Sequence, residues 1–135
     1  MRNKTFILSV LPERLGICKY DPSAPIPEWA YQFSFFSITR TSDELSIVCN
    51  ETHIPEEESC SIGWRCLKIK GPLDFSETGI LASLSRTLAA AGVPIFVLST
   101  YETDYILVKD KDLARAVEAL ENDGHKITDK ESRKT

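Results

Sequence analysis

The chain has 135 residues, of which 42% are hydrophobic and 27% charged, and its formal net charge is -4. These values are typical of a folded globular protein and exclude a disordered or collagen-like chain. Phosphate binding needs clustered Lys and Arg, and no basic stripe occurs, so we expect no nucleic-acid partner. The apolar runs are far shorter than the roughly 20 residues that span a bilayer, so we expect no membrane segment and a cytoplasmic location.

The first half of the chain contains apolar, β-branched runs separated by turn residues, a pattern that predicts strands. Pro12 marks a hairpin-like turn between the first two strands. The prolines between Asp21 and Pro27 exclude a central strand there, and a short helical turn is expected over residues 27–31. An acidic loop is expected over residues 50–61. The predicted strands are Thr5–Leu11, Leu15–Tyr20, Phe33–Thr39 and Leu45–Cys49.

The second half alternates between strand-like and helix-like patterns. Ile80, Leu84 and Leu88 recur at helical spacing, which predicts a helix over residues 77–91 that ends before Gly92. A second helix begins near residue 110, carries apolar residues at the same spacing, and ends near Gly124. The predicted strands are Trp64–Lys70, Ile95–Thr100, Tyr105–Lys109 and a short strand at Ile127.

The second half therefore follows the order β-α-β-β-α-β of a ferredoxin-like unit, in which four antiparallel strands carry two helices on one face. Its open sheet face and edges need cover, and the strands of the first half could supply it. We predict an α+β protein of two units, with a helix-poor unit over residues 1–62 and a second unit over residues 63–128. The polar tail, residues 129–135, is expected to be disordered.

The four cysteines show no C-x-x-C pair, and their spacing does not match known zinc ligands. Three of them lie in strand-like apolar segments, where a free cysteine behaves as a small hydrophobic residue. We therefore expect structural thiols, with a metal site or redox chemistry as the alternatives. The residues are Cys18, Cys49, Cys60 and Cys66.

The first candidate binding site is the predicted strand-to-helix connection over residues 71–80. The N-terminus of a helix presents unpaired backbone N–H groups that suit a carboxylate, and Gly79 would let a ligand approach the backbone closely. Asp74 lies in the same connection and could receive an ammonium group. The segment thus offers complementary charges for a zwitterionic amino acid, although an ordinary turn with a solvated Asp74 would explain the same residues.

The second candidate is the polar stretch Ser99–Asp104, which follows a strand of buried type. Polar groups at the end of such a strand can face a cleft. The alternative is a polar hairpin turn, because Ser, Thr and Asp all favour turns.

Catalytic motifs are missing from the sequence. His53 and His125 lie in loop-like or terminal contexts, and no nucleophile elbow, zinc-protease helix or P-loop occurs. The run Glu56–Glu58 is most simply a solvated loop. We therefore expect no enzyme activity, no catalytic residue, no metal and no cofactor.

Two stretches resemble the ACT-domain family over about residues 5–125: GPLDFSETGILASLSRTLAAAGVPIFVLSTYETDYILVKDKDL and FFSITRTSDELSIVCNE. They are similar to small bacterial ACT-domain proteins, to cytosolic arginine sensors of TOR signalling and, more distantly, to regulatory domains of aspartate kinases. The resemblance implies two ACT-like units, often assembled into a homodimer, that bind an amino acid between units and act as sensors. Aspartate kinases also carry a catalytic domain, for which this chain has no counterpart.

The resemblance places the ligand on the second unit, because the first half lacks a long helix. The runner-up interpretation is a structural or interaction module whose ligand site is vestigial. Asp104 matches an acidic position that lies close to the ligand in the arginine sensors. The ligand-binding residues implied by position are Leu73, Asp74, Phe75, Thr78, Gly79, Ile80, Val97, Leu98, Ser99, Thr100 and Asp104.

Overall fold

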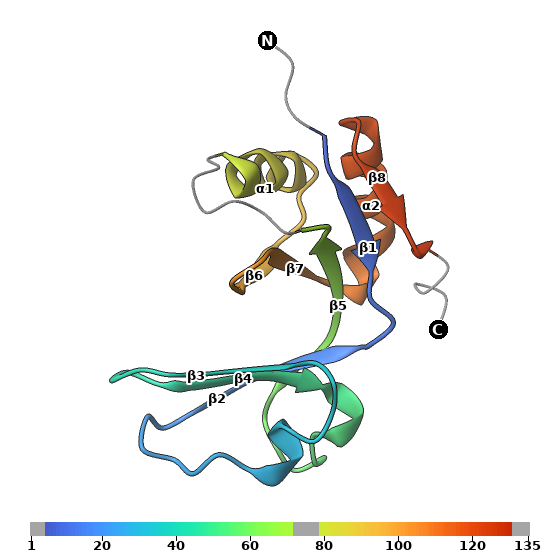
Figure 1. The fold of residues 1–135 in the computed structure, drawn as a ribbon. Helices are drawn as coiled ribbons and strands as arrows, with labels where there is room; N and C mark the ends of the chain where they lie inside the picture. The colour runs from blue at the N-terminus through green and yellow to red at the C-terminus, as the bar shows by residue number, and fades with distance from the viewer. Residues whose placement is uncertain (1–4, 72–78, 131–135) are drawn as a thin grey trace. The chain divides into compact units, whose positions relative to one another are not determined.

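The computed structural model describes residues 5–71 and 79–130 (Figure 1). None of the described helices is long and apolar enough to cross a membrane. The strands are β1 (Ile7–Val10), β2 (Leu15–Tyr20), β3 (Phe36–Arg40), β4 (Leu45–Asn50), β5 (Ser61–Ile69), β6 (Ile95–Ser99), β7 (Asp104–Lys109) and β8 (Lys126–Thr128). The α-helices are α1 (Ile80–Ala90) and α2 (Leu113–Asn122), and the short 3-10 helices are η1 (Glu28–Ala30), η2 (Glu51–His53) and η3 (Asp110–Asp112).

The chain divides into two compact units. Unit 1 comprises Met1–Pro12 and Arg65–Thr135, and unit 2 comprises Glu13–Trp64. The sequence predicted a single boundary between residues 62 and 63, whereas the structure inserts unit 2 between the first strand and the rest of unit 1.

The reason lies in the long strand β5. The predicted hairpin around Pro12 does not form, because β1 and β2 pair with different parts of β5. Leu8 of β1 lies opposite Ile69 near the end of β5, while Leu15 of β2 lies opposite Trp64. Pro12 therefore separates two strands that belong to different units, and β1 joins the unit that follows it in the sequence.

Unit 1 has the α+β architecture expected from the sequence, with one additional strand. Its strands lie in the order β6-β7-β5-β1-β8, and β1 runs antiparallel to β5 and parallel to β8. Both α-helices cover one face of this sheet (Figure 1). Apolar residues of that face and of the helices form the main core, including Leu8, Leu67, Ile69, Leu84, Leu88, Ile106, Val108, Leu113, Val117 and Leu120.

The ends of α1 and α2 follow the glycine signals in the sequence. After α1, Gly92 adopts a φ of 73°, and the Val93 N–H donates to the Leu88 carbonyl at 3.0 Å. After α2, Gly124 adopts a φ of 96°, and the His125 N–H donates to the Leu120 carbonyl at 3.0 Å. A left-handed residue lets these amides turn back onto carbonyls of the last helical turn, and glycine adopts it without strain.

Unit 2 is an antiparallel sheet in the order β3-β4-β2 followed by the first part of β5. Its described residues contain no α-helix, as the sequence predicted, and η1 occupies part of the expected helical turn. The strand predicted from Phe33 begins at Phe36. A second, smaller core lies on one sheet face and contains Cys18, Ala30, Leu45, Ile47 and Cys49, with Trp29, Ile38 and Cys60 packed against it.

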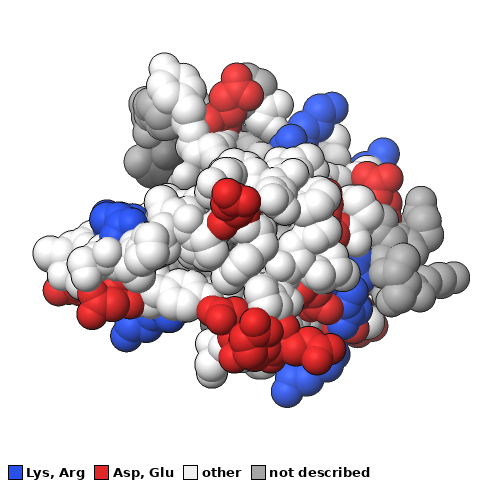
Figure 2. Space-filling view, turned by 90° about the horizontal axis from the view of Figure 1, so that it is seen from below, with Lys and Arg blue, Asp and Glu red and all other residues white. Residues whose placement is uncertain are grey.

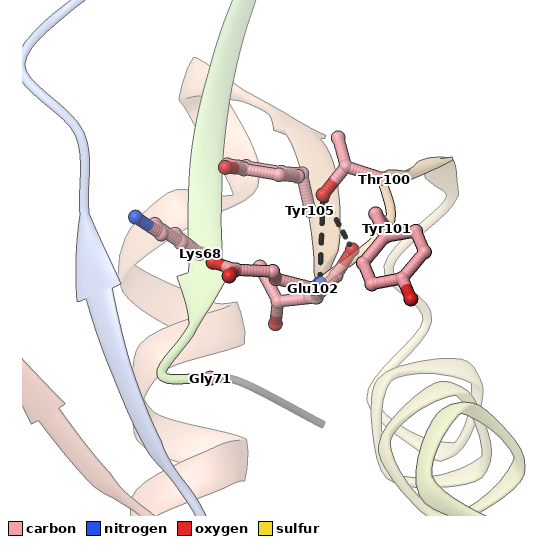
Figure 3. Close-up of a pocket in the computed structure, with 7 residues that line it drawn as sticks. Lys68, Gly71, Thr100, Tyr101, Glu102 and Tyr105 are labelled. Atoms are coloured by element: carbon pink, nitrogen blue, oxygen red, sulfur yellow. Dashed lines mark hydrogen bonds between the residues drawn. The ribbon is translucent and has the colours of Figure 1, made fainter. Parts of the chain in front are cut away.

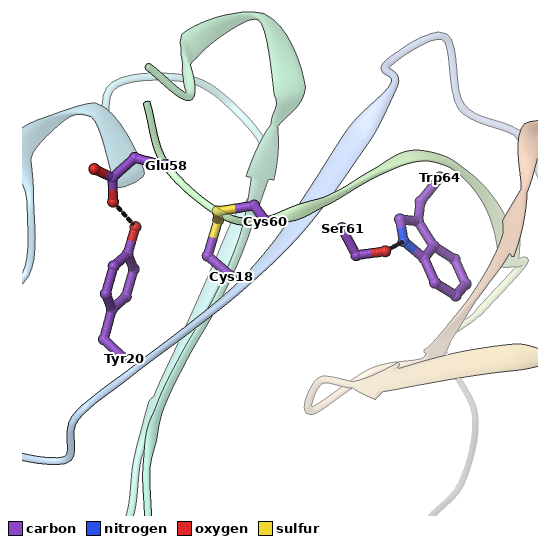
Figure 4. The surroundings of a disulfide bond; sticks show 6 residues. All are labelled: Cys18, Tyr20, Glu58, Cys60, Ser61 and Trp64. Atoms are coloured by element: carbon purple, nitrogen blue, oxygen red, sulfur yellow. Dashed lines mark hydrogen bonds between the residues drawn. A yellow bond between two sulfur atoms is a disulfide. The ribbon is translucent and has the colours of Figure 1, made fainter. Parts of the chain in front are cut away.

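A disulfide joins Cys18 to Cys60 in unit 2 (Figure 4), so the expectation of four free thiols is wrong. Ile17 of β2 lies opposite Ser61 of β5, and this pairing places the neighbouring Cys18 and Cys60 with their Cα atoms 4.5 Å apart. The two residues are 42 positions apart in the chain, so only the strand pairing reveals their proximity. Cys49 and Cys66 are free and buried, as expected.

Figure 2 shows the charged side chains on one face of the molecule. Several Asp and Glu side chains lie at the lower edge of this view with Lys and Arg beside them, and much of the rest of the face is uncharged. In unit 2, the Tyr20 hydroxyl donates to the Glu58 carboxylate, so one glutamate of the acidic loop is held against the sheet (Figure 4). Burial and this carboxylate together raise the pKa of Tyr20 above its ordinary range.

Candidate functional site

The turn between β6 and β7 lies at one end of the unit 1 sheet and is closed by its own polar groups. The Thr100 N–H donates to the Thr103 carbonyl at 2.9 Å, and the Thr103 hydroxyl donates to the Ile69 carbonyl at 2.6 Å. The first bond closes the turn, and the second ties it to the end of β5. The polar stretch after β6 is therefore a tight hairpin turn, and it also forms the rim of a site.

Ser99 and Asp104 face each other across the base of this turn. They are partners in the register of β6 and β7, and the Ser99 hydroxyl donates to the Asp104 carboxylate at 2.5 Å. Asp104 lies two residues before Ile106, whose side chain packs in the main core of unit 1, between the sheet and the helices (the helix-side core). Because side chains alternate along a strand, Asp104 and Ser99 point to the face of the sheet that carries the helices.

Helix α1 of the same unit begins after Gly79, which has a φ of 83° and offers no capping side chain. Among the described residues, no atom would lie within 4 Å of a Cβ atom at Gly79. The first amides of an α-helix have no partner within the helix. The start of α1 can therefore present backbone N–H groups to a ligand.

The structure places the other residues expected at the site in different positions, and some of them lie outside the described residues. Ile80 is 9% exposed and packs in the core, so only its backbone could contact a ligand. Val97 packs against the same core, while Leu98 lies opposite Tyr105 and therefore points to the other sheet face. Leu73, Asp74, Phe75 and Thr78 lie outside the described residues.

A pocket of about 230 Å³ opens on the sheet face opposite the helices. Figure 3 shows it between the end of β5, the β6–β7 turn and the start of β7. Lys68 and Tyr105 come from this open face, and the Lys68 ammonium lies 5.9 Å from the centre of the Tyr105 ring. The residues that line the pocket are Lys68, Gly71, Thr100, Tyr101, Glu102, Thr103 and Tyr105.

Sequence reasoning placed Thr100 among the expected ligand-binding residues and included Gly71, Tyr101, Glu102 and Thr103 in its two candidate segments, but it did not select Lys68 or Tyr105. Lys68 and Tyr105 each look like an ordinary polar position in an alternating strand, and only the adjacency of β5 and β7 brings them together. Glu102 was included in the second candidate stretch as a turn residue. The one available signal was the alternation itself, which puts Lys68 and Tyr105 on the solvent side of their strands.

A scan against family models identifies an ACT domain over residues 59–122. A second model, described as an N-terminal domain, matches residues 13–57. The two matched ranges follow each other along the chain.

Two human proteins are similar to this chain. CASTOR3P is 31% identical over 134 residues, covering 86% of this chain and 80% of its own length. The cytosolic arginine sensor for mTORC1 subunit 1 is 30% identical over 107 residues, covering 73% of this chain. That match spans only 32% of the length of the arginine sensor.

Comparison with solved structures also finds proteins that share the fold of this chain. Protein Atu0741 from Agrobacterium tumefaciens superposes with a TM-score of 0.86 and 42% identity, covering 93% of both chains. The regulatory subunit of aspartate kinase from Thermus thermophilus superposes with a TM-score of 0.63 at 11% identity, covering 85% of this chain and 95% of its own, and shares the fold. The resemblance to ACT domains of arginine sensors and of aspartate kinases is thus confirmed, and the chain belongs to the ACT-domain family.

Proposed function

We propose that this chain is a non-catalytic regulatory protein of the cytoplasm that binds a free amino acid on unit 1. The observation that carries the proposal is the arrangement at the helix side of the sheet end. A carboxylate, Asp104, lies on the hairpin that Ser99 helps to hold, and no described atom would lie within 4 Å of a Cβ at Gly79, where α1 of the same unit begins. The ACT-domain match and the relatives named as arginine sensors support a regulatory role.

The two ends of an amino acid suit this arrangement. Its carboxylate can accept hydrogen bonds from the backbone amides at the start of α1, where the helix dipole also favours negative charge. Its ammonium group can donate to Asp104, whose carboxylate has lone pairs beyond the one that accepts from Ser99. We further propose that the site is completed by a second copy of the chain, as the family resemblance implies, and that a partner protein reads the bound state.

A thermal-shift screen of the twenty amino acids at millimolar concentration tests the binding proposal. One or a few amino acids are expected to raise the melting temperature, and Asp104→Asn should remove that rise. Asp43→Asn is the matched control, because Asp43 is an exposed carboxylate in the turn before β4, in unit 2. No shift with any amino acid, in a protein that native mass spectrometry shows to be dimeric, would contradict the proposal.

A structural or interaction module with a vestigial site is the second candidate. The observation that favours it is the Ser99–Asp104 bond, because this carboxylate already has a partner inside the protein. If that function holds, Asp104→Asn and Asp74→Ala leave the regulatory output unchanged, while variants that break the dimer abolish it.

A further inference from the structure

Lys68 and Tyr105 occupy a sheet face that the helices do not cover. Leu67 and Ile69, which flank Lys68, both pack in the helix-side core, and so does Ile106, which follows Tyr105. Because neighbouring side chains of a strand point to opposite faces, Lys68 and Tyr105 must point away from that core. The pocket of about 230 Å³ that they line is therefore on the other face of the sheet from Asp104.

The pocket contains one positive and one negative side chain that do not neutralise each other. Among the residues the structure describes, neither Lys68 nor Glu102 takes part in a salt bridge. The Lys68 ammonium instead lies 5.9 Å from the Tyr105 ring centre, a weak contact that leaves its N–H donors available. Figure 3 shows Lys68 on β5 and Glu102 on the β6–β7 turn, so the two charges come from separate elements.

Hydrogen bonds within the protein itself hold the residues around these two charges. The Thr103 hydroxyl fixes the turn to the Ile69 carbonyl at 2.6 Å, and the Thr100–Thr103 bonds close the turn (Figure 3). Gly71 lines the pocket without a side chain that could fill it. A largely preformed cavity with a few placed polar groups is the usual form of a small-molecule site.

Size and charge together select the ligand class. Cavities for drug-sized ligands measure about 300–1,000 Å³, so a pocket of about 230 Å³ suits a smaller metabolite. A simple carboxylate would meet Glu102 unfavourably, and a simple amine would meet Lys68 unfavourably. A molecule that carries both an ammonium and a carboxylate satisfies both residues.

We propose that unit 1 has a second ligand site, on the sheet face opposite its helices, which holds a small zwitterion between the Lys68 ammonium and the Glu102 carboxylate. The carboxylate of the ligand accepts from Lys68, and its ammonium group donates to Glu102. This site does not depend on the helix-side site, because the two lie on opposite faces of one sheet and share no charged side chain.

Nuclear magnetic resonance titration of the full chain tests the proposal, with each of the twenty amino acids as probe and with acetate and methylammonium as half-ligands. At least one amino acid is expected to shift the backbone amides of Gly71, Glu102 and Tyr105 in a saturable way, and each half-ligand should bind at least about tenfold more weakly. Lys68→Met and Glu102→Gln should each weaken binding of the amino acid by about tenfold or more. Lys111→Met and Glu118→Gln, exposed residues of the same unit, are the matched controls and should leave it unchanged.

The outcomes separate this site from the helix-side site. Asp104→Asn should leave the response of Gly71 and Glu102 intact, whatever it does to the thermal shift. If no amino acid moves these amides, or if Lys68→Met and Glu102→Gln bind like the parent protein, the second site does not exist and the helix-side proposal is untouched. If Asp104→Asn abolishes the response at Gly71 and Glu102, there is one site only, and the inference is again wrong.

Discussion

The Thr103 hydroxyl donates a 2.6 Å hydrogen bond to the backbone carbonyl of Ile69, 34 residues earlier in the chain. Thr103 is 5% exposed, so this carbonyl lies beside a side chain that has little contact with water. The bond joins the turn after β6 to the last residue of β5, and both candidate ligand sites border this junction. This buried hydroxyl therefore helps to hold the turn against the end of β5.

Thr103→Val removes that hydroxyl while keeping the shape of the side chain. The Ile69 carbonyl loses its partner in a buried place, so we expect the free energy of unfolding to fall by about 1–3 kcal/mol. Urea denaturation measures the change. Thr39→Val is the matched control on the exposed strand β3 and should change stability by no more than about 0.5 kcal/mol. Equal effects of the two substitutions would contradict a special role for Thr103.

Reduction of the Cys18–Cys60 disulfide is expected to destabilise unit 2. The bond links residues 42 positions apart and so restricts the unfolded chain, which is worth about 4 kcal/mol on the chain-entropy account. Urea denaturation with and without a dithiol reductant measures the loss, and hydrogen exchange localises it to residues 13–64.

The double variant Cys18→Ala/Cys60→Ala is the control for reduction. It should have the stability of the reduced parent protein, and the reductant should not change it further. If the oxidised protein and the double variant unfold at the same urea concentration, the disulfide contributes nothing to stability. The bond joins Cys18 on β2 to Cys60, the residue immediately before β5 (Figure 4), so any loosening should begin at this strand pair.

Local patterns were sufficient to predict most elements of unit 1. The spacing of Ile80, Leu84 and Leu88 identified α1, and all three residues are buried in the core. The glycines after both helices marked their ends, because a left-handed residue is needed there whatever the tertiary structure. Such signals depend on neighbours in the chain, so the sequence carries them directly.

Features that depend on strand pairing could not be predicted. The membership of β1 in unit 1, the proximity of Cys18 to Cys60 and the meeting of Lys68 with Tyr105 all follow from which strands lie side by side. Pairing between distant segments is decided by the whole sheet rather than by any local pattern. Disulfides are uncommon in the cytoplasm, so the Cys18–Cys60 bond gives no support to the cytoplasmic location expected from the sequence.

Alkaline conditions should weaken the fold through Cys49. Burial raises the pKa of this thiol from an ordinary 9.0 to about 11, so the folded protein holds the proton more tightly than the unfolded chain does. The contribution is complete below the unfolded pKa of 9.0 and is lost as the pH rises through about 11. Urea denaturation across that pH window should show a steeper decline for the parent protein than for Cys49→Ala. Identical declines would show that the thiol does not titrate in this way.

His125 joins the start of unit 1 to the end of α2. Its Nδ1 accepts a hydrogen bond from the Phe6 N–H at 3.0 Å, and its ring stacks on the Phe6 ring with centroids 5.8 Å apart. Because Nδ1 accepts, the proton of the neutral ring must be on Nε2, which lies 3.5 Å from a carboxylate oxygen of Asp123. The residue is 4% exposed, so the acceptor cannot easily be replaced by water.

Two substitutions of His125 distinguish the effect of its hydrogen-bond acceptor from the effect of its ring packing. His125→Leu keeps an apolar side chain but leaves the Phe6 N–H without its partner, and should cost about 1–3 kcal/mol of unfolding free energy. His125→Asn keeps an acceptor oxygen near the position of Nδ1 and should retain more of the protection of the Phe6 amide against hydrogen exchange. Faster exchange at Phe6 in His125→Leu than in His125→Asn would show that the hydrogen bond holds β1 in place. Both variants lose the packing of the imidazole ring against Phe6. If the Phe6 amide exchanges equally fast in both, this packing, rather than the hydrogen-bond acceptor, holds β1 in place.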